Sequence, residues 1–266
     1  VVTESIFDLT EAGSNHIHQR ISQQAHQGSS IYAILQDVWE EAGPDLVLTQ
    51  ELCPVCAVSY SAVKQAVRTL RGITQVLSLE PSTVEDILGT ILKVGEATGT
   101  DAEAKALIAG LSERIDAVTT LTSTVSHRPR VACIEWLDPL FVGGHWVPQM
   151  VEMAGGKDSL GVKKEPAFSI NWFQLIMYQP DAVIFMPCGF NVRRCIRELS
   201  EMEFPPGWYE MPAVKNDKVF AADGSAFFSR PGPRVVDGLE ILAEILHPEM
   251  FPPAPHPDRW VQVPLV

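Results

Sequence analysis

The fold is indicated most clearly by the stretch Pro180-Asp181-Ala182-Val183-Ile184-Phe185-Met186. A Pro-Asp turn precedes an apolar run without polar alternation, which is typical of a strand buried on both faces of a parallel sheet. The same pattern occurs earlier as Pro44-Asp45-Leu46-Val47-Leu48. In both places a polar loop and a helical pattern follow, over Pro44–Leu70 and Pro180–Met202. We therefore expect an α/β protein with two Rossmann-like lobes.

Working outward, apolar spacing and turn residues place further elements. We expect Ser82 to begin a helix as a cap paired with Glu85, and Gly155-Gly156 to end another. Trp146 and Phe173 are expected in the core, and the proline-rich tail from His247 is expected to wrap the surface. The further strands predicted are 72–77, 130–136 and 218–221. The helices predicted are 14–39 with a break at Gly28, 59–70, 82–124 with a break at 99–101, 147–154, 171–178, 191–202 and 233–246.

These elements predict three parts of the chain. An N-terminal α/β lobe covers residues 1–80, connecting helices cover 81–127, and a C-terminal α/β lobe with the tail covers 128–266. Ligands of parallel sheets bind outside the carboxyl ends of the strands, and pockets favour domain interfaces. A ligand cleft between the two lobes is therefore expected.

Composition, charge and missing motifs argue against several classes of function. The chain has 266 residues, 46% hydrophobic and 20% charged, with a formal net charge of −13, so binding to phosphate backbones is disfavoured. Five cysteines at uneven spacing do not predict a disulfide framework. No apolar run is long enough for a transmembrane helix, and no signal peptide is visible in a chain that starts at Val1. Nucleophile-elbow, Walker, zinc-protease and dinucleotide-binding motifs are missing, so we do not expect an enzyme.

Three stretches carry a resemblance to a known family. They are Arg130–Gly156, Met211–Phe220, and Phe227-Phe-Ser-Arg-Pro-Gly-Pro-Arg234 with the Val-Val-Asp-Gly-Leu-Glu-Ile-Leu that follows. In this order they resemble the second lobe of the helical-backbone (class III) periplasmic substrate-binding proteins that deliver cobalamin or ferric siderophores to ABC importers. The two Pro-Asp strands fit the two lobes of that family. Family members begin with a strand, a helix and a strand that have no counterpart before Val1.

The resemblance implies a fold, a ligand class and a partner. Two α/β lobes would be joined by a long helix and would hold a corrinoid, haem or ferric chelate, with no cofactor required. Acidic residues would meet arginines of an ABC permease, and Glu198 and Glu201 are the candidates for that contact. The location would be periplasmic or extracellular.

Candidate ligand-binding residues lie in the expected loops at strand ends. Aromatic walls suit a large flat ligand, although the same rings could pack as inter-lobe core. Arg230 could bind ligand carboxylate, phosphate or amide oxygens, or form a loop-stabilising salt bridge. His145, after two glycines, could be an axial ligand or a simple hydrogen-bonding residue. The predicted ligand-binding set is Gln50, Glu51, Trp136, Phe141, His145, Trp172, Phe190, Phe227, Phe228 and Arg230.

The motif Cys53-Pro-Val-Cys56 supports an alternative hypothesis about the function. Two sulfurs three residues apart can bind a metal or form a redox disulfide, and Cys188 follows the corresponding strand of the other lobe. The three cysteines could form a soft-metal or axial-ligand site, or be buried inert thiols. The alternatives to a transport protein are therefore a C-x-x-C redox or metal-handling protein, and a degenerate binding fold used as an interaction module.

Overall fold

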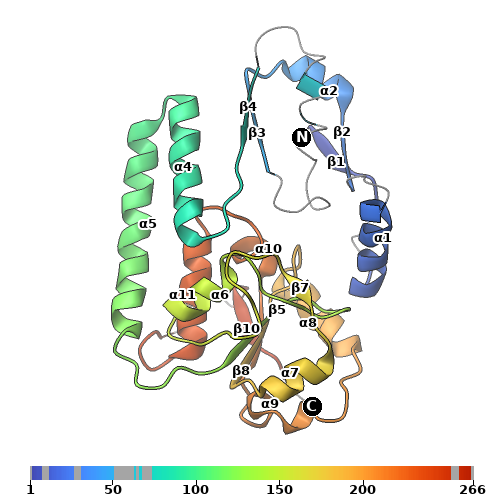
Figure 1. Ribbon diagram of the computed structural model, residues 1–266, viewed down its shortest axis with the longest axis vertical. Helices are drawn as coiled ribbons and strands as arrows, with labels where there is room; N and C mark the ends of the chain where they lie inside the picture. The colour runs from blue at the N-terminus through green and yellow to red at the C-terminus, as the bar shows by residue number, and fades with distance from the viewer. Residues whose placement is uncertain are drawn as a thin grey trace. The chain divides into compact units, whose positions relative to one another are not determined.

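The chain divides into two compact units, Val1–Pro81 and Ser82–Val266, and each is described by itself. None of the helices in the described residues is long and apolar enough to cross a membrane. The computed structural model (Figure 1) describes residues 2–7, 12–26, 31–50, 63, 66–67, 74–252 and 258–264.

The first unit combines two short sheets with helices. Strands β1 and β2 pair antiparallel, and β3 and β4 pair in parallel with Leu46 opposite Gln75. The core contains Trp39 and Val47, and the Trp39 indole donates a hydrogen bond to the Ala66 carbonyl at 3.2 Å. The elements are β1 (Thr3–Ser5), α1 (Ser14–His26), β2 (Tyr32–Ile34), α2 (Gln36–Ala42), β3 (Leu46–Thr49) and β4 (Gln75–Ser78).

One prediction for this unit is wrong. Helical spacing was expected to resume after Gly28 and continue to residue 39, but Tyr32–Ile34 is a strand. It pairs with Thr3–Ser5, a strand that the sequence did not predict. Backbone pairing with a distant segment outweighs the local apolar spacing here. The predicted helix 59–70 lies largely outside the described residues.

Two helices open the second unit and pack against each other. α4 (Val84–Thr98) ends at Gly99, which takes a left-handed φ of 70°, and α5 (Asp101–Thr122) follows. The predicted cap was one residue too early, because Thr83 and not Ser82 caps α4, with Asp86 in place of Glu85. The Asp86 carboxylate accepts from the Thr83 N–H and also from Ser82. Both helices belong to the second unit, in which α5 packs against α11. A separate connecting part over residues 81–127 stays a prediction.

A mixed sheet forms the centre of the second unit, in the strand order β10-β9-β8-β5-β6-β7. β5, β8 and β9 are parallel, with Val131 opposite Ala182 and Val183 opposite Val219, and the outer strands are antiparallel. This confirms the predicted α/β class. The strands are β5 (Val131–Trp136), β6 (Phe141–Val142), β7 (Phe168–Ser169), β8 (Ala182–Phe185), β9 (Val219–Ala222) and β10 (Trp260–Gln262).

Helices cover both faces of this sheet. In Figure 1, α4, α5, α6 and α11 lie on one side, and α7, α8 and α9 lie on the other. Trp146 is buried as predicted, but Phe173 is 68% exposed, because the short helix α7 turns Leu175 inward and leaves Phe173 on its outer side. The remaining helices are α6 (Val147–Met153), α7 (Trp172–Tyr178), α8 (Val192–Glu201), η1 (Trp208–Glu210), α9 (Pro212–Lys215), α10 (Gly224–Phe227) and α11 (Val235–Leu246).

The aspartate of the second Pro-Asp turn joins two of the parallel strands. The Asp181 carboxylate accepts from the backbone N–H of Arg130 at 2.8 Å and from its guanidinium at 3.3 Å. The residue that precedes β5 is thereby tied to the residue that precedes β8. Asp181 of the second Pro-Asp turn therefore supports the pairing of β8 with β5.

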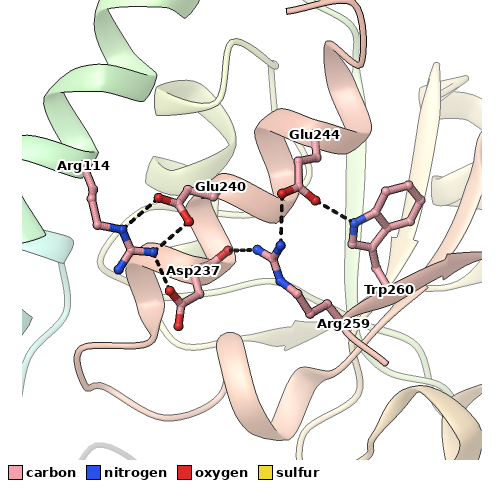
Figure 2. A network of polar contacts seen from close by, with 6 residues as sticks. All are labelled: Arg114, Asp237, Glu240, Glu244, Arg259 and Trp260. Carbon is pink, nitrogen blue, oxygen red and sulfur yellow. Dashed lines mark hydrogen bonds and ion pairs between the residues drawn. The ribbon is translucent and has the colours of Figure 1, made fainter. Parts of the chain in front are cut away.

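The tail after His247 does more than wrap the surface. Residues Trp260–Gln262 form β10, which pairs antiparallel with β9 at one edge of the sheet. Its anchor is the nearly buried Glu244 of α11, which accepts from Arg259 and from the Trp260 indole, each at 3.0 Å (Figure 2). A buried carboxylate needs such partners, so the ion pair accounts for the strand's position.

A second, more exposed group of charges joins α5 to α11. The Arg114 guanidinium donates to Glu240 at 2.7 and 2.8 Å and also to Asp237 (Figure 2). These carboxylates raise the pKa of Arg114. Helix α5 is thus joined to α11 by ion pairs as well as by packing.

The Glu244 anchor gives a stability prediction. Glu244→Ala leaves the Arg259 charge and the Trp260 N–H without their acceptor, in a pair whose side chains are 14% and 8% exposed. We expect a loss of about 3 kcal/mol in the free energy of unfolding, measured by urea denaturation. Lys163→Gln is the control, because its pair with Glu152 is nearly half exposed and should contribute about 0.5 kcal/mol. Equal small losses in both variants would contradict the prediction.

Candidate functional site

The candidate site is the edge of the second unit at which the parallel strands end. β5, β8 and β9 run in the same direction, so the loops after Trp136, Phe185 and Ala222 meet at one edge. Two backbone bonds join these loops: the Cys188 N–H donates to the Glu135 carbonyl at 3.0 Å, and Ser225 donates to Phe190 at 3.2 Å. This is the position at which open α/β sheets bind ligands.

Two of the predicted aromatic residues form a pair at this edge. The rings of Trp136 and Phe190 lie 5.4 Å apart at 60°. The Arg194 guanidinium lies 4.0 Å from the centre of the Phe190 ring. Asn191 holds this geometry, because its side chain caps α8 by accepting from the Arg194 N–H at 2.9 Å. The result is an aromatic and cationic surface at the ends of β5 and β8.

Glu135 precedes Trp136 in β5, is half-buried, and was not among the predicted site residues. The Glu135 side chain, at the end of β5, accepts from the Gly144 N–H at 3.2 Å. Burial raises the pKa of Glu135 to about 8; the Gly144 N–H opposes this and Asp158 adds to it. The carboxyl is therefore largely protonated at neutral pH. The sequence did contain a signal for this residue: Glu135 is the one charged residue of the otherwise apolar strand Val131–Trp136.

The loop after β6 depends on close backbone packing. A Cβ added to Gly144 would lie 2.2 Å from the backbone nitrogen of Ala167, so only glycine fits. His145 follows with a positive φ of 50° and stacks on Trp146 with ring centres 5.7 Å apart. Its Nδ1 is buried without a hydrogen-bond partner among the described residues, and burial lowers the pKa of His145. His145 is thus a neutral imidazole on this loop.

The loop after β9 contributes the predicted Phe227, Phe228 and Arg230. Phe228 is buried, and its carbonyl accepts from the Trp146 indole at 2.9 Å. Arg230 is exposed. Phe227 borders an open pocket of about 510 Å³ that also contacts Asp223, Asp237, Glu240, Asp258 and Arg259.

Cys188 lies at the same edge, but the predicted metal site stays a prediction. Cys188 is exposed, and its thiol interacts with the Ser229 side chain and with the charge of Arg230. Cys53 and Cys56 lie outside the described residues, as does Glu51. Within the described ranges, no group of three or more His, Cys, Asp or Glu side chains is placed to hold a metal ion.

Three other predicted residues lie apart from the aromatic pair or at its margin. Gln50 follows β3 in the first unit. Phe141 is half-buried in β6, opposite Trp136 in the strand register. Trp172 belongs to a different cluster, with its ring 5.7 Å from each of Phe204 and Trp208.

Comparison with known proteins identifies the family. The sequence profile described as "Periplasmic binding protein" matches residues 41–226. The chain belongs to this family. A curated relative is the ABC transporter substrate-binding lipoprotein YvrC of Bacillus subtilis, 24% identical over 220 residues, which are 78% of this chain and 63% of YvrC. The match thus spans less than two thirds of that relative's length.

Solved structures confirm the fold of the periplasmic binding protein family. An ABC transporter substrate-binding protein of Listeria monocytogenes superposes with a TM-score of 0.68 at 19% identity, over 80% of each chain. A periplasmic haem-binding protein of Pseudomonas aeruginosa gives 0.67 at 18%, over 84% of this chain and 78% of that one. The vitamin B12-binding protein BtuF of Vibrio cholerae gives 0.62 at 18%, over 80% and 78%. The resemblance inferred from sequence is therefore confirmed.

The buried Glu135 carboxyl predicts a pH dependence. Its pKa rises from 4.5 to about 8 on folding, so the folded state holds the proton more tightly and stability falls as the pH rises through this interval. Glu135→Gln keeps an acceptor for Gly144 and removes the titration. We expect it to be more stable than the parent at pH 8, by on the order of 2 kcal/mol, and similar at pH 4.5.

Urea unfolding over a pH series measures this difference. Glu96→Gln is the control, because this carboxylate is exposed on helix α4 and should leave the pH profile unchanged. Identical profiles for the parent and Glu135→Gln would show that the carboxyl is not protonated in the folded state.

Proposed function

We propose that this protein is the substrate-binding subunit of an ABC importer, and not an enzyme. It captures a large, flat metal-containing ligand of the corrinoid, haem or ferric-chelate class and delivers it to a membrane permease. The observation that carries the proposal is the Trp136–Phe190 pair at the carboxyl edge of the sheet in a periplasmic binding protein. On this proposal the protein acts outside the cytoplasmic membrane.

The geometry of the edge supports a large apolar ligand. A macrocycle gains most of its affinity from contact with rings, and the half-buried Trp136 offers one that Phe190 holds in place. His145 adds a neutral imidazole on an adjacent loop, which suits an axial metal ligand or a hydrogen-bond donor. Arg230 adds a cation at the rim.

The relatives support the ligand class but not one ligand within it. The Pseudomonas aeruginosa structure is a haem-binding protein, and the Vibrio cholerae structure binds vitamin B12. A third relative, from Saccharomonospora viridis, belongs to a ferric-hydroxamate transport system. These ligands share a metal ion held in a broad organic chelate. The proposal for this chain is this class of ligand and not one member of it.

The permease contact is proposed on helix α8. Glu201 is exposed at its last residue, and Glu198 lies one turn earlier. Carboxylates at the end of a surface helix can pair with arginines of a partner protein.

Ligand titration tests the proposal. Cobalamin, cobinamide, haemin and ferric siderophores are added in turn while absorbance and tryptophan fluorescence are followed. We expect at least one to bind, and Trp136→Ala to weaken that ligand by about tenfold through loss of ring contact. Tyr209→Ala is the matched control, because Tyr209 is an exposed aromatic residue of η1, which precedes the amino end of β9. Absence of binding by every ligand would overturn the proposed function.

A further inference from the structure

The two loops that follow β8 and β9 have a charge opposite to that of the whole chain. Residues 187–194 and 223–234 contain four arginines and one acidic residue, Asp223, in a chain with a net charge of −13. The arginines are Arg193, Arg194, Arg230 and Arg234. The rest of the protein is acidic, so these two loops form a local region of positive charge. Such a region attracts anionic ligands.

Their arrangement keeps this positive charge at the ligand-binding edge. Arg194 lies on the face of Phe190, one of the two paired rings. Arg230 and Arg234 are exposed, and no residue that the structure describes forms an ion pair with either of them. Burial raises the pKa of Asp223, and the positive charges of Arg234 and Arg230 oppose this by lowering it. Arg230 also acts on Cys188, in the loop after β8.

The acidic residues of the same edge offset this charge only in part. Asp237 and Glu240 border the pocket beside Phe227, as Asp258 does, but Asp237 and Glu240 are paired with Arg114. Glu135, with a pKa raised to about 8, contributes little negative charge at neutral pH. Asp138 is the acidic residue in the loop after β5, and counting it with Asp223 against the four arginines leaves a formal excess of two positive charges over the three loops. Helices α8 and α11 begin at this edge, and their amino ends add partial positive charge.

We infer that the ligand is an anion: a ferric chelate or macrocycle that carries carboxylate, catecholate or phosphate groups, with Arg230 and Arg234 determining the selectivity for its charge. This inference rests on the proposed function and narrows its ligand class. The aromatic pair contacts the apolar body of the ligand, and the arginines bind the anionic groups at its margin. Arginine suits this role, because its planar guanidinium binds such oxygens through two parallel hydrogen bonds.

Two chelates of similar size and different charge test the inference. The probes are the trianionic ferric complex of a tris-catecholate siderophore and the uncharged ferric complex of a trihydroxamate siderophore. Haemin, with two propionates, and its dimethyl ester form a second matched pair. Affinity is measured by tryptophan fluorescence for the parent, for Arg230→Gln/Arg234→Gln, and for Arg230→Lys/Arg234→Lys.

We expect the parent to bind the anionic member of a pair at least about tenfold more tightly, with an affinity that falls as salt is added. The glutamine variant should lose about tenfold for the anion and less than about twofold for the uncharged analogue. The lysine variant keeps the charge and should retain the salt dependence. Lys105→Gln, on exposed α5, removes one cation away from this edge and should change neither affinity.

The possible outcomes separate the two proposals. If the uncharged chelates bind as tightly as the anionic ones, or if the glutamine variant retains full affinity for the anion, the inference is wrong and the proposed function stands. If no chelate, haemin or cobalamin binds the parent, both are wrong. Arg234 makes no side-chain cap bond to α11, so its replacement removes no helix cap, and circular dichroism checks that the variants are folded.

Discussion

Three parallel strands with both faces buried determine the position of every other element in the second unit. β5, β8 and β9 are almost entirely covered, because helices pack on each face. Their backbone groups are paired on both sides, and β6, β7 and β10 extend the sheet in either direction. Since the three strands are parallel, the residues that introduce them lie at one edge and the residues that follow them lie at the other.

The two edges have different physical roles. At the amino edge, Asp181 bonds to Arg130 and ties two strands together. Near the end of β5, the carboxyl of the half-buried Glu135 has a pKa raised by desolvation, and on the loop after β6 the Nδ1 of His145 has no hydrogen-bond partner among the described residues. The Glu244–Arg259 ion pair holds β10 to α11 at the end of the sheet formed by β9 and β10.

Elements with a strong local signal were predictable from the sequence. The apolar run Ala182–Phe185, the strand Val131–Trp136 and the helix Val235–Leu246 are where periodicity placed them. The two missed strands have a common cause, which is contact with a segment distant in the chain. Tyr32–Ile34 is a strand because Thr3–Ser5 pairs with it, and Trp260–Gln262 is a strand because β9 and Glu244 hold it. Composition alone could not show either pairing.

The sequence by itself determined the α/β class, the family, and the placement of Trp136, Phe190 and Arg230 at or just after the ends of strands. These depend on the apolar period and on residue order. Only the tertiary structure decided which of those residues meet. It brought Trp136 against Phe190 and placed Arg194 on the same ring, while Trp172 joined a separate cluster with Trp208. It also made Glu135 a proton-holding carboxyl, since a pKa depends on burial and on neighbours such as Gly144 and Asp158. Those neighbours are supplied by packing between distant segments, and a linear pattern does not contain them.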